Sequence, residues 1–196
     1  MKKIILASAS PRRRELLAQI GLEFIVMPSD VEENPKSILP QDVVIELSKE
    51  KARDIWIKIA EGGREDALVI SADTVVAIEG EILGKPKDEE DAVRMLSLLS
   101  GKEHQVYTGV TMIWISEEGK QEEYSFYVCT GVVMYRMNRA EIMEYVCSGD
   151  PMDKAGAYAV QGRAAAYIKS IRGEYSNVVG LPVGRLFQEM KAWDLA

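Results

Sequence analysis

Residues 5–16, ILASASPRRREL, join a short apolar run to three consecutive arginines through a Ser-Ala-Ser-Pro turn. The run from Lys3 to Ala7 is apolar and short, which predicts a buried strand. Ser10 is a favoured N-cap residue, and Pro11 suits the first position of a helix because its missing N–H would be unpaired there. The stretch therefore predicts a strand, a tight turn and a helix that ends at Gly21.

Three arginines occupy the first turn of this predicted helix. That turn carries free N–H groups and a positive partial charge, so an arginine there opposes the helix dipole. A bound anion reverses the effect, and helix N-termini bind phosphate readily. Arg12 and Arg13 are therefore candidate ligands of an anion, with Ser8 and Ser10 beside them. The alternative is that the arginines are solvated or pair with acidic groups, and this applies best to Arg14.

The whole chain has the composition of one folded domain over residues 1–196, with 47% hydrophobic and 28% charged residues and a formal net charge of −7. The negative charge weighs against nucleic-acid and anionic-membrane partners. No apolar run approaches the ~18 residues of a membrane span, and the N-terminal run is too short for a signal peptide. Cys129 and Cys147 lack metal-ligand spacing, which favours free thiols in the cytoplasm.

The rest of the chain predicts helices that alternate with strands. Between the two long strands, Glu118 and Gly119 predict the turn of a hairpin, and Asn138 with Glu141 resembles a capping box. Hairpins among alternating elements indicate a mixed sheet in an α/β protein. Helices are expected at 41–60, 88–99, 138–148 and 183–193, and strands at 24–27, 67–78, 81–83, 105–115, 122–135 and 164–171.

Asp73 interrupts an almost wholly apolar run, VISADTVVAI at 69–78. A buried carboxylate is costly unless it is paired, hydrogen-bonded or bound to a metal. Asp73 is therefore either a strand-end carboxylate that bonds nearby backbone, or a base or metal ligand at the edge of a cleft. Lys85 lies in GEILGKPKD at 80–88, which is no Walker A loop because Pro86 stands where Ser or Thr would bind magnesium. Lys85 reaches a phosphate or is a solvated turn lysine.

Two further segments carry polar groups that suit a nucleotide. Glu32 and Glu33 follow a predicted strand, and divalent cations such as Mg²⁺ prefer carboxylate oxygens, although a solvated acidic loop is the default. Gln161 lies in the small-residue segment 150–168, where backbone can approach a ligand closely and an amide suits a base edge. The alternative for that segment is a packing seam between lobes.

Two other features are open to a structural reading. The stretch YSNVVGLP at 175–182 is expected to be a loop that closes the same cleft or forms a turn. His104 is the one histidine of the chain, which excludes sites that need several, and it is expected to be structural or exposed.

Taken in order, several segments resemble the Maf family of nucleoside triphosphate pyrophosphatases, and together they cover nearly the whole chain. The resemblance implies an elongated mixed sheet flanked by helices, with two lobes around a cleft, similar to the inosine triphosphatase (Ham1-like) proteins. It also implies hydrolysis of a nucleoside triphosphate to the monophosphate and pyrophosphate with Mg²⁺ or Mn²⁺, in a cytoplasmic and commonly dimeric enzyme. The segments are SASPRRRELL, the pair Glu32-Glu33, SADTVV, GKPKD, LSGKEHQVYTGV, DPMDKAGAYAVQGRAAAYI and NVVGLP.

The family divides by substrate, and three positions resemble the branch that acts on dTTP and UTP. These are Arg12 after Ser-Pro, Thr74 after the key aspartate and Gln161 in the AGAY segment. The resemblance therefore implies dTTP, UTP and modified pyrimidine nucleotides as the substrate class. Ala159, where glycine is frequent, is a small departure that would tighten the pocket wall.

The resemblance also implies roles for individual residues. Asp73 would be the proton acceptor that activates water, Glu33 its acidic companion, and one or both would hold the metal. Lys51 is implied on family likeness alone, because by pattern it is one more solvated helix lysine. The implied phosphate contacts are Lys51, Lys85, Ser8, Arg12 and Arg13.

Two rivals from other classes follow from the sequence. One is a non-enzymatic, nucleotide-binding regulator of septum formation in cell division, a process to which the family has been linked. The other is a nucleic-acid binder that uses the SPRRR turn, against which the net charge of −7 argues.

Overall fold

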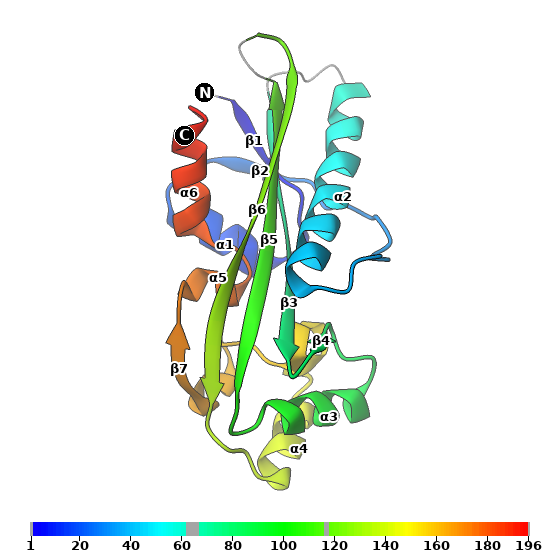
Figure 1. Cartoon of the computed structure of the whole chain (residues 1–196), viewed down its shortest axis with the longest axis vertical. Coiled ribbons are helices and arrows are strands. Elements are labelled where there is room, and N and C mark those ends of the chain that lie inside the picture. The colour runs from blue at the N-terminus through cyan, green and yellow to red at the C-terminus, as the bar shows by residue number, and fades with distance from the viewer. Residues whose placement is uncertain (1, 62–66, 116–117, 196) are drawn as a thin grey trace.

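The computed structural model describes residues 2–61, 67–115 and 118–195. Within these ranges the chain forms one elongated mixed sheet of seven strands with helices around it, which confirms the expected α/β class (Figure 1). The strand order is β2-β1-β3-β5-β6-β7, with β4 paired to β3. The strands are β1 Lys3–Leu6, β2 Phe24–Val26, β3 Ala67–Ile78, β4 Glu81–Leu83, β5 Glu103–Ile115, β6 Gln121–Met134 and β7 Ile168–Arg172.

The helices lie on both sides of the sheet. The long helix α2 is on one side, and α1 and α6 are on the other (Figure 1). The helices α3 and α4 pack together at one end of the molecule, beside three short 3₁₀ turns. The α-helices are α1 Pro11–Gln19, α2 Pro40–Glu61, α3 Glu89–Leu99, α4 Arg139–Cys147, α5 Tyr175–Val179 and α6 Val183–Ala192, and the 3₁₀ turns are η1 Asp150–Asp153, η2 Ala155–Ala157 and η3 Arg163–Tyr167.

The lengths of the strands leave part of β3 open at its edge. The parallel pairing of β1 with β3 ends where Leu6 meets Ile70, and the antiparallel pairing with β4 begins at Val76. Between these points, 71–75 pair with β5 on one side only. Asp73 lies at the centre of this open edge, so its backbone pairs with β5 on one side and with no described strand on the other.

The helix α2 approaches the sheet unusually closely at one glycine. A Cβ added to Gly109 on β5 would lie 2.4 Å from the carbonyl oxygen of Val44 on α2, so no side chain fits there. Further along the helix, buried Ala52 and Ile55 share a core cluster with Val69 of β3. These contacts fix the height and rotation of α2 above the sheet, and therefore the position of every side chain it carries.

Local sequence signals are confirmed at two helix starts. Asn138 accepts from the N–H of Glu141, and the Glu141 carboxylate accepts from the N–H of Asn138, which completes the expected capping box. Helix α1 begins at Pro11 as expected, with Ser10 at its N-cap. The Ser10 side chain makes no capping hydrogen bond, so proline and not the serine hydroxyl determines this start.

Two expectations near the C-terminus are corrected. The strand expected at 164–171 begins only at Ile168, because 163–167 form a 3₁₀ turn in which the Ala165 N–H donates to Gly162 O. The alanines of this turn lack the β-branched side chains that favour a strand. The expected loop at 175–182 contains the helix α5, which ends at Gly180 with a positive φ of 128°.

His104 is structural and not exposed. It is fully buried, and its Nε2 lies 2.7 Å from the hydroxyl of Tyr158. Burial lowers the pKa of His104 to about 4, so the ring is neutral at physiological pH. Cys129 and Cys147 are both free and exposed. Among the described residues, no helix is long and apolar enough to cross a membrane.

Candidate active site

A pocket of about 610 Å³ opens along the free edge of β3. It receives side chains from α1, α2, β3, the loop before α2, the loop after β4 and the segment after η2. The nine residues to which the sequence and the family resemblance assign a role line this one pocket, as does Ser10, although they are spread over more than 150 positions of the chain; Glu32, named beside Glu33, is not among the lining residues. The nine are Ser8, Arg12, Arg13, Glu33, Lys51, Asp73, Thr74, Lys85 and Gln161.

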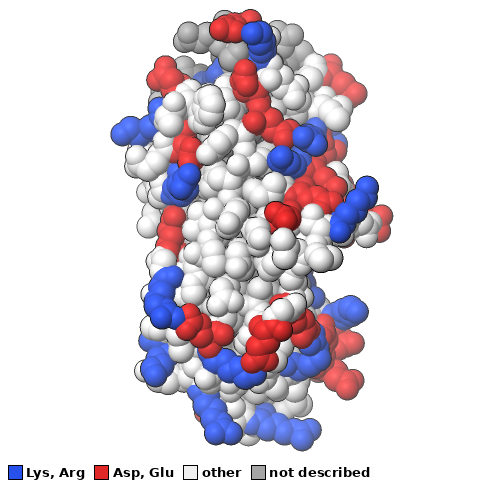
Figure 2. All heavy atoms as spheres, in the orientation of Figure 1, with Lys and Arg blue, Asp and Glu red and all other residues white. Residues whose placement is uncertain are grey.

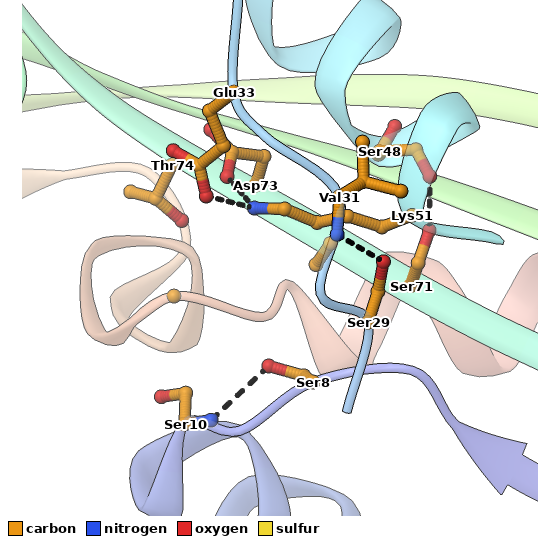
Figure 3. A network of polar contacts seen from close by, with 12 residues as sticks. Ser8, Ser10, Ser29, Val31, Glu33, Ser48, Lys51, Ser71, Asp73 and Thr74 are labelled. Carbon is orange, nitrogen blue, oxygen red and sulfur yellow. Dashed lines mark hydrogen bonds and ion pairs between the residues drawn. The ribbon is translucent and has the colours of Figure 1, made fainter. Parts of the chain in front are cut away.

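Lys51 joins the two carboxylates of the site. Its Nζ lies 2.5 Å from Oδ1 of Asp73 and 2.7 Å from Oε1 of Glu33 (Figure 3). The Lys51 side chain is 14% exposed and that of Asp73 10%, so the pair is shielded from water. Shielding strengthens the attraction between opposite charges that are already bonded.

The ionisation of Glu33 follows from this arrangement. Burial alone would raise the pKa of the carboxyl, but the hydrogen bond and the charge of Lys51 outweigh it, and the net pKa lies below its ordinary value. Lys85 and Arg13 add smaller contributions in the same direction. Glu33 is therefore a carboxylate at neutral pH and can serve as a cation ligand.

The donor set fits a divalent cation that also binds the substrate. Lys51 uses one oxygen of each carboxylate, and within the described residues nothing bonds Oδ2 of Asp73 or Oε2 of Glu33. The described part of the chain has no group of three or more His, Cys, Asp or Glu arranged around a metal position. Magnesium is commonly held by one or two carboxylates together with water and substrate phosphates. Glu33 and Asp73 match that pattern, with the remaining ligands left to phosphate and water.

Arg13 is a cross-link between three segments. Its Nε donates to Gly180 O at 2.8 Å, and its Nη1 donates to Ala72 O at 2.7 Å and to Ser8 Oγ at 3.3 Å. Its Nη2 donates to Thr74 Oγ1 at 3.1 Å. Burial lowers the pKa of Arg13, and the charge of Asp73 opposes that shift. Four of its five N–H groups are spent on the protein, so its first effect is to hold α1 against β3 and the end of α5.

Arg12 and Lys85 leave more of their charge available to a ligand. Arg12 Nη1 lies 3.5 Å from Asp153 Oδ2 on η1, a loose pairing that agrees in part with the acidic-partner alternative. Lys85 is exposed and has no hydrogen-bond or ion-pair partner in the described ranges. Its loop is held from the other side, because the Gly156 N–H donates to Gly84 O at 3.0 Å. Both side chains line the pocket, where each can contact a bound anion.

Several residues that line the pocket are not predicted from the sequence. Asp153, Tyr158 and Gly180 all face the pocket. All three lie in segments quoted for the family resemblance, DPMDKAGAYAVQGRAAAYI and NVVGLP, but nothing in the local pattern of Asp153 and Gly180 distinguishes them from turn residues. Tyr158 is buried against His104, and the spacing of the two residues along the chain carries no signal of that contact.

Comparison with known proteins identifies the family of this chain. The family model described as Maf-like protein matches residues 3–193. A relative from Agathobacter rectalis named dTTP/UTP pyrophosphatase is 55% identical over 199 residues, which cover 97% of each chain. One from Lachnoclostridium phytofermentans with the same name is 48% identical and covers all of this chain.

Among solved structures, a HAM1 protein from Coxiella burnetii superimposes with a TM-score of 0.51 at 13% identity, covering 98% of this chain and 100% of that one. This likeness confirms the expected Ham1-like fold and shows nothing beyond it. The match of the family model over nearly the whole length, together with relatives at such identity, shows that the chain belongs to the Maf-like protein family.

Proposed function

We propose that the protein hydrolyses nucleoside triphosphates of the dTTP and UTP class to the monophosphate and pyrophosphate. The main observation in support is that Lys51 bonds both Asp73 and Glu33 in a pocket that Arg12 and Lys85 also line. The relatives named dTTP/UTP pyrophosphatase support the substrate class. Arg12, Thr74 and Gln161 carry the choice of base in this proposal.

The reaction follows from what each side chain can do. Asp73 accepts a proton from water, whose oxygen attacks phosphorus of the anhydride between the α- and β-phosphates. That P–O bond breaks, and the leaving pyrophosphate takes up negative charge. Lys85 and Arg12, which both line the pocket, neutralise this charge. Lys51 holds the Asp73 carboxylate in place, so the base is positioned before the substrate arrives.

A divalent metal, held by Glu33 and Asp73, would polarise the phosphate oxygens and compensate their charge when bound. Mg²⁺ and Mn²⁺ are the candidates, since both accept carboxylate oxygens. Removal of the metal by a chelator should abolish turnover and leave the melting temperature within a few degrees, because Lys51 already bonds both carboxylates and compensates part of their charge. Turnover that persists in excess chelator would contradict this part of the proposal.

The testing experiment compares Asp73→Asn with the wild type and with Asp42→Asn. Asp42 is an exposed residue in the first turn of α2, and it does not line the pocket. Pyrophosphate release from dTTP and UTP should fall by at least about 1,000-fold in Asp73→Asn and remain within about twofold in the control. Near-full activity of a well-folded Asp73→Asn would overturn the assignment of the base.

The predicted partners follow the same reasoning. A non-enzymatic regulator would bind nucleotides and release no product, so the same experiment separates it from the enzyme. The net charge of −7 supports the absence of a nucleic-acid partner. On the face drawn in Figure 2, acidic and basic side chains are interspersed around an uncharged middle. The homodimer and the cytoplasmic location stay predictions from the family resemblance.

A further inference from the structure

A chain of hydroxyl groups leads from the pocket into the core. Oγ1 of Thr74 lies 2.9 Å from Oγ1 of Thr108 on β5. Oγ1 of Thr108 in turn donates to the backbone carbonyl of Asn177 on α5, at 3.0 Å. Thr108 is fully buried, so no water competes for its hydroxyl. A carbonyl oxygen only accepts, and a hydroxyl has one hydrogen, so the hydrogen of Thr108 is committed to Asn177.

The acceptor at the end of this chain is fixed. Asn177 is fully buried, and its Nδ2 donates to Val106 O and to Thr130 Oγ1, both at 3.0 Å. These two bonds tie α5 to β5 and β6. The carbonyl that receives the Thr108 hydroxyl is therefore held by the fold and cannot turn away.

The direction of the remaining bonds follows. Because Thr108 donates to Asn177, its oxygen can only accept from Thr74, and the hydrogen of Thr74 is spent there. The reverse arrangement would place two buried acceptor oxygens, of Thr108 and Asn177, 3.0 Å apart with no hydrogen between them, which is costly. The Nη2 of Arg13 also donates to Thr74. Thr74 is left with one lone pair and no hydrogen to offer.

The Thr74 side chain that carries this lone pair borders the pocket. Thr74 is partly exposed and lines the cavity together with Gly180. A Cβ added to Gly180 would lie 3.6 Å from Thr74 Oγ1 and 3.5 Å from Arg13 Nε. The absence of a side chain at Gly180 therefore leaves room beside the hydroxyl for a ligand atom.

We propose that Thr108 is a positioning residue that makes Thr74 a pure hydrogen-bond acceptor toward the pocket, and that this selects bases with an N–H donor at the ring position facing Thr74. The inference rests on the proposed function and assigns base discrimination to a residue outside the pocket. Uracil and thymine carry an N3–H donor, whereas N3 of cytosine is an acceptor and would meet the lone pair of Thr74. The cytosine amino group donates from the next ring position, and using it would displace the base relative to its phosphates.

Gln161 cannot make this distinction by itself. It is exposed and has no hydrogen-bond partner in the described part of the chain, and an amide presents either its oxygen or its NH₂ after a flip. It can therefore match uracil and cytosine equally well. Thr74 is the group of fixed polarity, and Thr108 is the cause of that polarity.

The experiment measures kcat/KM for UTP and CTP, and the affinity for UMP and CMP by calorimetry, in the wild type and three variants. Thr108→Val keeps the shape of the side chain and removes the oxygen that accepts from Thr74, so the Thr74 hydroxyl can rotate and donate. We expect the UTP:CTP and UMP:CMP preferences to fall by about tenfold in Thr108→Val. Thr108→Ser keeps the hydroxyl and should keep both preferences. Thr74→Val removes the acceptor and should lower both preferences even if Thr108→Val folds poorly.

A purely structural role for Thr108 would lower kcat/KM for UTP and CTP by the same factor, and that result would overturn the inference. A wild type that does not distinguish UTP from CTP would also overturn it. So would a Thr74→Val variant that keeps the UTP:CTP and UMP:CMP preferences of the wild type. Failure of the proposed function can be distinguished from failure of this inference, because it would appear as the absence of pyrophosphate from every nucleotide tested. The monophosphate affinities still test the polarity of Thr74 in that case.

Discussion

The ammonium of Lys51 on α2 lies 2.5 Å from Oδ1 of Asp73 on β3, and the two residues are 22 positions apart in the sequence. The same ammonium lies 2.7 Å from Oε1 of Glu33, which belongs to the loop before α2. Without it, the shielded carboxylate of Asp73 and the half-exposed carboxylate of Glu33 would lie close together with no shared positive charge between them. Lys51 thus makes the acidic centre stable in the absence of a metal, and it holds the proposed base in place.

Replacing this lysine should inactivate the enzyme without unfolding it. In Lys51→Met the two carboxylates lose their shared counter-charge, so the Asp73 side chain is no longer held and the pKa of Glu33 rises. We expect kcat/KM to fall by about 100-fold or more. Lys49→Met is the matched control on the same helix, since Lys49 pairs only loosely with Glu123, at 3.8 Å. Similar losses in the two variants would show that the position of Lys51 is not what matters.

Acid should destabilise the protein through its one histidine. The pKa of His104 is about 4 in the folded protein against 6.5 for the free side chain, so the unfolded chain binds more protons between these values. Stability is therefore fully present above about pH 6.5 and falls as the pH drops toward 4, by about 3 kcal/mol from this group.

Urea unfolding at pH 7, 5.5 and 4.5 measures this loss. His104→Gln retains a polar group near the Tyr158 hydroxyl and does not titrate, so its stability should depend less on pH over this range. If both proteins lose stability in parallel, His104 is not responsible for the acid sensitivity.

Arg13 should contribute more to folding than its neighbour in the same helical turn. Arg13→Met leaves the carbonyls of Ala72 and Gly180 without their donor, which should cost about 2–4 kcal/mol in the free energy of unfolding. Arg14→Met is the control, because Arg14 is exposed and should change stability by less than about 0.5 kcal/mol. Equal effects of the two substitutions in urea titrations would contradict the cross-linking role.

The close approach of α2 at Gly109 can be tested by adding one methyl group. In Gly109→Ala the Cβ would meet the Val44 carbonyl at 2.4 Å, so α2 must move away from β5. We expect a loss of about 2–3 kcal/mol and a fall in kcat, because Lys51 moves with the helix. Gly84→Ala meets no atom within 4 Å and should leave the unfolding free energy nearly unchanged. A stable, fully active Gly109→Ala would show that the helix position is not critical.

Much of the fold could be predicted because its signals are local. Pro11 determines the start of α1, and Asn138 with Glu141 determines the start of α4, each within a few residues. The turn at 163–167 was missed because a run of alanines has no periodicity that separates a 3₁₀ turn from a strand. Its backbone conformation depends on contacts with distant segments.

The residues named from the sequence and the family resemblance line one pocket, but the contacts between them could not be predicted. Asp73 stood out because a carboxylate in an apolar strand needs a partner, but no pattern named Lys51 as that partner. Lys51 resembles any solvated lysine on a helix until α2 is packed on β3. The hydroxyl chain from Thr74 through Thr108 to Asn177 joins three segments, and the polarity it imposes depends on geometry that only the folded chain has.

The most direct test of the central claim is to identify the products of dTTP and UTP hydrolysis with Mg²⁺ by phosphorus NMR. The account predicts one pyrophosphate and one monophosphate for each triphosphate consumed. Orthophosphate and a diphosphate would keep the triphosphate site and contradict the bond that is cleaved. No product from the folded, metal-supplied protein would contradict the enzyme itself.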